Sequence, residues 1–158
     1  MPSSDIAAQR DQVDVRGPRF AAWMTTAVLV LVLLASAVSR LAAALMLGAQ
    51  AVVFAIGAAG GPRRHPYGRL FASFVAPRLE PVTEREPVAP LRFAQAVGLV
   101  FAVVGVIGFA AGVSVVGFWV GLVATAFALV AAFLNAAFGI CLGCRLYPLV
   151  ARFRPTGA

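Results

Sequence analysis

The sequence predicts an all-α integral membrane protein with four transmembrane helices arranged as two hairpins. The first observation is composition: 61% of the 158 residues are hydrophobic and 12% are charged, against roughly 25% charged residues in an average soluble domain. The second is a set of uncharged runs long enough to cross a bilayer, and the third is the confinement of arginine to segments beside those runs. The length fits a single membrane domain over 1–158.

The first two spans are predicted before residue 62. An uncharged run from Phe20 to Ser39 predicts a span near 18–39, and Arg40 ends this run. The next uncharged stretch predicts a span near 41–61. Each stretch provides about 20 residues of helix, which is the length that crosses the hydrocarbon core.

The other two spans are predicted in the second half of the chain. The uncharged stretch from Phe93 to Cys144 is too long for one span and long enough for two. A turn bracketed by Gly112 and Gly117 divides it, which places the spans near 91–112 and 116–141. Many small residues in the fourth span would let neighbouring helices approach closely.

Three segments remain outside the spans. Residues 1–17 are expected to be a mobile tail, 62–90 a loop, and 145–158 a C-terminal segment. Between residues 67 and 75, apolar side chains at helical spacing predict a short helix in the membrane interface. A loop whose apolar residues pack against the bundle is the alternative.

The arginines predict the topology. Twelve of the thirteen basic residues, all arginines, lie in or beside these three segments, and only Arg40 lies on the opposite side. Because basic residues concentrate on the cytoplasmic side, both termini and the loop 62–90 are expected in the cytosol. The formal charge of +7 does not indicate nucleic-acid binding, since it flanks apolar runs instead of covering a soluble face.

The sequence also contains a hint of internal duplication. Arg19-Phe20-Ala21 opens the first span and Arg92-Phe93-Ala94 opens the third. In the same alignment, Gly57 and Gly60 match the two cysteines. This pattern predicts two parallel hairpins related by an axis along the membrane normal.

The candidate functional residues are Cys141, Cys144 and Arg145, within Gly139-Ile140-Cys141-Leu142-Gly143-Cys144-Arg145. A dithiol for redox chemistry or sulfur transfer is the first hypothesis, with the cysteines as catalytic residues and Arg145 as a thiolate stabiliser. A continuous fourth helix would place the thiols at its negative end and disfavour the thiolate. A break at the glycines would place Cys144 near the start of a new helix. On the cytosolic side, a structural disulfide is not expected.

Two other hypotheses remain open for the cysteines. Packing of two small, weakly polar residues at a helix end is the second. Metal or iron–sulfur ligation is the third, and it requires a second chain, as in a homodimer, because two thiolates supply half of a four-ligand site. His65 is a candidate third ligand, although a loop histidine is more often solvated. No cofactor is otherwise predicted.

The four uncharged runs contain no Asp, Glu, Lys, Arg or His, which argues against a proton-coupled transporter or channel. Gln50, Gln95 and Asn135 are the large polar residues inside them. We expect these amides to form interhelical hydrogen bonds.

The chain resembles a bacterial membrane-protein family classed as domain of unknown function 4395. The resemblance rests on three motifs: Val13-Asp14-Val15-Arg16-Gly17-Pro18-Arg19-Phe20, Pro90-Leu91-Arg92-Phe93-Ala94-Gln95, and Leu134-Asn135-Ala136-Ala137-Phe138-Gly139-Ile140-Cys141-Leu142-Gly143-Cys144. It covers nearly all of the chain after the first dozen residues. It implies a bacterial inner-membrane location and thioredoxin-like or rhodanese-like (sulfurtransferase-like) soluble partners.

Together these observations predict a bilayer-embedded, cytosol-facing dithiol protein that acts in thiol redox or sulfur relay. The alternative is a non-catalytic membrane scaffold or assembly subunit that docks a partner through its arginine-rich cytosolic face. Whether the protein is an enzyme is left open by the sequence.

Overall fold

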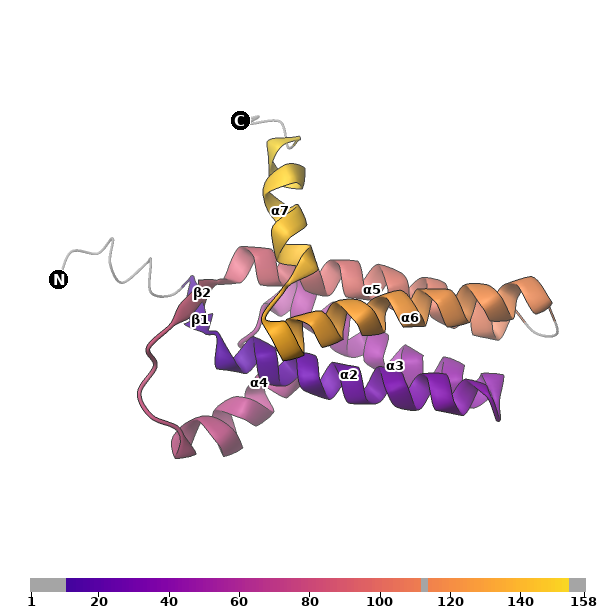
Figure 1. The fold of residues 1–158 in the computed structure, drawn as a ribbon, viewed down its shortest axis with the longest axis horizontal. Helices are drawn as coiled ribbons and strands as arrows, with labels where there is room; N and C mark the ends of the chain where they lie inside the picture. Colours follow the sequence, from indigo (N-terminus) through magenta and orange to yellow (C-terminus); the bar gives the residue numbers. More distant parts are fainter. Residues whose placement is uncertain (1–10, 112–113, 154–158) are drawn as a thin grey trace.

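The computed structural model describes residues 11–111 and 114–153, and it shows a bundle of four long helices (Figure 1). These helices are α2 (Arg16–Ser36), α3 (Arg40–Gly60), α5 (Val88–Ala110) and α6 (Val115–Phe138). Each is long and apolar enough to cross a membrane. The predicted all-α, multi-pass membrane fold is therefore confirmed, with span ends that differ from the expected ones by up to three residues.

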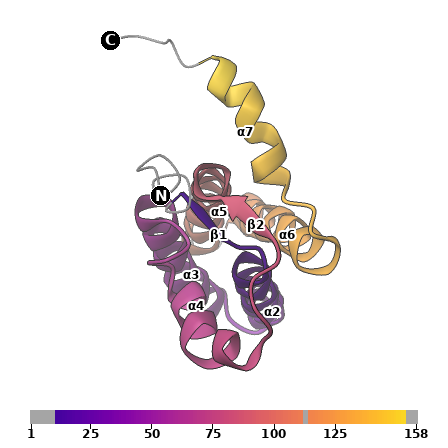
Figure 2. The same ribbon diagram turned by 90° about the vertical axis from the view of Figure 1, so that its left-hand side faces the viewer.

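The four helices form two hairpins that pack side by side. Helix α3 packs against α5 and α2 packs against α6, which closes a ring when the bundle is viewed end-on (Figure 2). Leu29, Leu47 and Phe109 fill the centre and are almost fully buried. Large apolar side chains such as Leu34 and Ile107, each 63% exposed, cover the outside. An apolar exterior of this kind suits contact with lipid.

Serine side chains start the second helix of each hairpin. The Ser39 hydroxyl accepts a hydrogen bond from the Ala42 N–H at 3.2 Å, and the Ser114 hydroxyl accepts one from the Gly117 N–H at 3.3 Å. A serine in this position satisfies one of the free N–H groups of the first helical turn. The short turn before Arg40 therefore forms without proline or glycine.

Residues 12–14 form a strand, which corrects the expectation of a mobile tail over 1–17. Strand β1 (Gln12–Asp14) pairs antiparallel with β2 (Arg85–Pro87), and Val13 lies opposite Glu86. The Arg16 guanidinium, in the first turn of α2, also pairs with the Asp14 carboxylate at 2.8 Å. These contacts fix the chain at the entrance to the first span. Residues 1–10 lie outside the described part of the chain.

The middle segment carries the predicted short helix as three consecutive turns. They are α4 (Pro66–Leu70), the π-helical η1 (Phe71–Val75) and the 3₁₀ turn η2 (Ala76–Arg78). Phe71 is buried, with its ring 5.8 Å from that of Phe20, whereas Phe74 is 60% exposed. The apolar face is thus divided between the bundle and its surroundings.

The hint of duplication predicts two hairpins, and the structure adds a strand before each hairpin and a short helix after it. The matched positions differ from the predicted ones, however. Helix α3 ends before Gly61 (φ 74°) and α6 ends before Gly139 (φ 67°), so these two glycines correspond. The expected match of Gly57 and Gly60 with the cysteines is wrong, because Gly57 and Gly60 lie inside α3 and the cysteines follow α6.

Candidate functional site

The site begins where α6 ends, three residues before the predicted end of the fourth span. Gly139 adopts a left-handed backbone conformation that glycine takes without a Cβ clash. The N–H groups of Gly139 and Ile140 donate to the carbonyls of Asn135 and Leu134, both at 3.1 Å. These two bonds close the last turn of α6, as in a Schellman motif. The helix is therefore broken before the cysteines.

Cys141 is the N-cap of a new helix, α7 (Leu142–Arg152). Its backbone is extended, and its Sγ accepts a hydrogen bond from the Cys144 N–H at 3.2 Å. The Arg145 N–H donates to the Cys141 carbonyl at 3.1 Å. Sulfur thus occupies the position in which serine or aspartate oxygens usually cap a helix. The expectation that a continuous helix would hold both thiols at its negative end does not apply.

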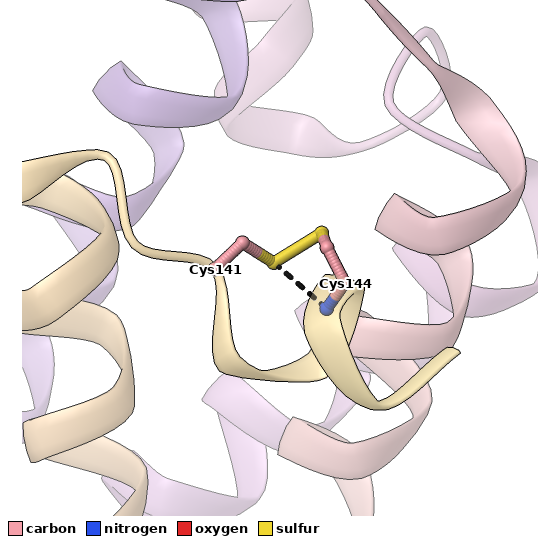
Figure 3. Close-up of a disulfide and its surroundings, with 2 residues drawn as sticks. All are labelled: Cys141 and Cys144. Carbon is pink, nitrogen blue, oxygen red and sulfur yellow. Dashed lines mark hydrogen bonds between the residues drawn. A yellow bond between two sulfur atoms is a disulfide. The ribbon is translucent and has the colours of Figure 1, made fainter. Parts of the chain in front are cut away.

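The two sulfur atoms lie at disulfide distance and are joined in the structure (Figure 3). The Cα atoms of Cys141 and Cys144 are 5.2 Å apart. This separation falls within the roughly 4.4–6.8 Å that disulfides span. The backbone of the turn therefore holds the two cysteines at a separation that suits a disulfide.

Helix α7 is docked on α5 by a glycine. A Cβ placed on Gly143 would lie 2.6 Å from both Cα and Cβ of Ala94, which is far closer than normal carbon contact. One turn later, the Tyr147 and Phe93 rings lie 5.9 Å apart. Glycine at position 143 is thus what allows the first turn of α7, with both cysteines, to rest against α5.

Helix α7 leaves the bundle sideways in both ribbon views (Figures 1 and 2). Its apolar side chains recur at helical spacing and are each at least 39% exposed: Leu142, Leu146, Leu149 and Val150. Leu142 and Leu146 also line a cavity between the long helices. The first part of the apolar face of α7 therefore borders the bundle, and the rest of this face is exposed.

Arginine side chains lie on both sides of the cysteine turn. Arg145 is exposed in the first turn of α7. The Arg19 guanidinium packs against Gly139, where an added Cβ would be 3.1 Å from Arg19 Cζ. Burial, assisted by the charge of Glu84, raises the pKa of Glu86 to about 7, and Arg19 partly opposes this shift. A positive charge thus sits beside the negative end of α6.

A cavity of about 290 Å³ opens at Cys141. It extends between α5 and α6, where the stacked rings of Phe101 and Phe127 lie 6.1 Å apart. Gln95 and Asn135 are among the few polar residues that line it. Asn135, predicted to bond between helices, thus borders this cavity.

His65 lies away from the cysteines, in a second cavity of about 500 Å³ beneath α4. It is only 2% exposed, so the expectation of a solvated loop histidine is wrong. Burial lowers its pKa, and a contact with Gln95 partly offsets this. Neither ring nitrogen, nor Gln95 Oε1, has a hydrogen-bond partner of good geometry among the described residues. The Tyr67 hydroxyl donates to Gln50 Oε1 at 2.8 Å.

The structure therefore brings together Cys141, Cys144 and the backbone of Arg145, and it does not add His65 to them. Within residues 11–111 and 114–153, no group of three or more His, Cys, Asp or Glu side chains could hold a metal ion. Sequence reasoning missed Gly143 as a contact residue, although its place between the cysteines was visible. It also missed the cavity, because no residue pattern signals a void between helices.

The comparisons with known proteins identify a family. No curated protein and no solved structure matches the chain. A family model described as a domain of unknown function (DUF4395) matches residues 13–152, which includes all four spans, β2 and the cysteine turn. The chain therefore belongs to the DUF4395 family.

Proposed function

We propose that the protein is a membrane-anchored dithiol whose Cys141–Cys144 pair exchanges electrons or sulfur with a soluble, thioredoxin-like or sulfurtransferase-like partner. The observation that carries the proposal is the hydrogen bond from the Cys144 N–H to Cys141 Sγ at the start of α7. Partial positive charge at a helix N-terminus stabilises a thiolate, and the thiolate is the form that attacks disulfides.

The exchange follows ordinary thiol–disulfide chemistry. The Cys141 thiolate attacks one sulfur of the partner's disulfide, and the partner's other sulfur leaves as a thiolate. Cys144, deprotonated in turn, attacks the mixed disulfide at Cys141 and releases the reduced partner. Two electrons pass from the dithiol to the partner, and the Cys141–Cys144 disulfide forms. Arg145 favours the thiolate through its charge.

The proposal places the pair at the cytosolic face of the bacterial inner membrane. Arginine gathers in the loop before α5 and in α7, at the same end of the bundle as the cysteines. The exposed apolar side chains of α7 fit a helix that lies in the interface, with Arg145 and Arg152 available to phosphate headgroups.

The test is redox titration of the purified protein in glutathione buffers, with thiols counted by alkylation and persulfide by mass spectrometry. We expect a disulfide that closes and opens with potential in the wild type. In the reduced single variants, Cys144→Ser, which keeps Cys141, should react with an aromatic disulfide reagent about tenfold faster than Cys141→Ser. If the pair forms neither disulfide nor persulfide and both variants retain wild-type behaviour in cells, the scaffold alternative prevails.

A further inference from the structure

The cavity that opens at Cys141 has the chemistry of a site for an apolar ligand. Rings of Phe54, Phe101 and Phe127 line it, together with alanines of α6. Its volume of about 290 Å³ is close to the lower end of the roughly 300–1,000 Å³ typical of ligand pockets, so it fits a single ring-sized group. No arginine is among the residues that line this cavity.

The cavity is reached from the side of the bundle. Phe127 both lines it and is 61% exposed, so one edge of the cavity lies at the apolar exterior. Leu142 and Leu146 of α7 line its other end, beside the cysteine turn. A ligand dissolved in the bilayer would therefore enter between helices and arrive directly at Cys141.

Two amide side chains provide polar contacts inside this apolar space. Gln95 and Asn135 line the cavity, and the side chain of Gln95 also borders the neighbouring cavity, where it contacts His65. An amide offers both a donor and an acceptor. It can therefore donate to a ring carbonyl and accept from the hydroxyl that replaces this carbonyl on reduction.

From these observations we infer that the cavity binds the ring of a membrane-soluble quinone, which exchanges electrons with the Cys141–Cys144 pair. The inference rests on the proposed dithiol function and names its second substrate class. In the oxidising direction, the two thiols lose two electrons and two protons and form the disulfide. The quinone gains both electrons and both protons and leaves as the quinol.

The experiment uses the full chain, reduced and freed of reductant, in nanodiscs of phosphatidylcholine and phosphatidylglycerol. Decylubiquinone is the probe, because its fully substituted ring blocks addition of thiols to the ring. Quinone reduction is followed by absorbance and thiol loss by alkylation. We expect one quinone reduced and two thiols lost per chain, and no reduction by a variant carrying both Cys→Ser changes.

Filling the cavity distinguishes binding from collision at the surface. Ala131 lines the cavity, whereas the adjacent Val130 is 53% exposed on the same helix. Ala131→Phe should slow quinone reduction about tenfold or more, because its ring takes the ligand's volume, while Val130→Phe should react as wild type. Closure of the disulfide by glutathione disulfide should remain unchanged in both variants, which verifies their folding.

The outcomes separate the two proposals. If glutathione disulfide does not oxidise the pair in the wild type, the dithiol function itself fails. If it does, but decylubiquinone is not reduced, or is reduced equally fast by Ala131→Phe, then only the quinone inference is overturned. In that case the cavity holds a lipid chain or no ligand.

Discussion

The contact between Gly143 and Ala94 makes a sharp prediction about the reactivity of Cys141. In Gly143→Ala, the new Cβ would start 2.6 Å from two carbon atoms of Ala94. Since carbon atoms pack at about 3.5–4.0 Å, the first turn of α7 must move away from α5 by roughly 1 Å. Crowding of this kind costs about 1–3 kcal/mol of the free energy of unfolding.

This movement should weaken the bond from the Cys144 N–H to Cys141 Sγ, now 3.2 Å long. A hydrogen bond to a charged group contributes about 1.5–3 kcal/mol, so its loss should lower the thiolate population about tenfold. The assay is the rate of alkylation of Cys141 by iodoacetamide at neutral pH. It is done in a Cys144→Ser background, which keeps the backbone N–H and prevents the disulfide.

Gly48→Ala in α3 is the matched control, because a Cβ there meets no atom within 4 Å. It should leave the alkylation rate unchanged and should not lower the thermal midpoint, because alanine favours a helix over glycine by about 0.5–1 kcal/mol. The reasoning is refuted if Gly143→Ala alkylates as fast as its parent and unfolds at the same temperature. In that case the glycine does not position the cysteine turn.

Two further predictions concern the strands and the end of α3. In the folded protein the pKa of the Glu86 carboxyl is about 7, above its ordinary value of 4.5, so the folded protein binds the carboxyl proton more tightly than the unfolded chain does. The protonated carboxyl therefore stabilises the fold fully below about pH 4.5, and this stabilisation is lost as the pH rises through about 7. Glu86→Gln should abolish this loss of stability, which is no more than about 3 kcal/mol in the wild type. If the thermal midpoint of the variant falls between about pH 5 and pH 8 as much as that of the wild type, Glu86 is not the group responsible. Arg92 donates to the carbonyls of Ala58 and Ala59, both at 2.9 Å, so Arg92→Ala should cost about 1–2 kcal/mol, measured as a lowered thermal midpoint. Arg69→Ala is its control, because Arg69 is exposed in α4, and equal midpoints for the two variants would show that the bonds to α3 do not stabilise the fold.

The four spans could be predicted because a helix that crosses a bilayer needs about 20 residues and excludes charged side chains from the hydrocarbon core. Runs such as Phe20–Ser39 meet both conditions, and the positions of their ends follow within a few residues. The turn before Arg40 was harder to predict, since it depends on one hydrogen bond from the Ala42 N–H to the Ser39 hydroxyl. Such a cap is common but is not visible as a breaker in the sequence.

The residues of the candidate site could be predicted from the sequence motif, but their arrangement in space could not. Gly139 and Gly143 were visible as helix breakers, yet only the structure shows that the first ends α6 and the second packs on Ala94. A close contact between two helices depends on their crossing, and no pattern within one helix encodes it. The strands β1 and β2 were missed for a related reason: each has three residues, and its partner lies across the whole first hairpin.

The pairing of β1 with β2 has a consequence for the insertion of the chain into a membrane. The strands directly precede α2 and α5, so each stays on the side from which its hairpin enters. Pairing of Val13 with Glu86 requires both hairpins to have entered from one side. A chain with one inverted hairpin would leave the two strands separated by the bilayer, with their backbone hydrogen bonds unmade. The small sheet can therefore form only in molecules whose two hairpins have inserted in the same orientation.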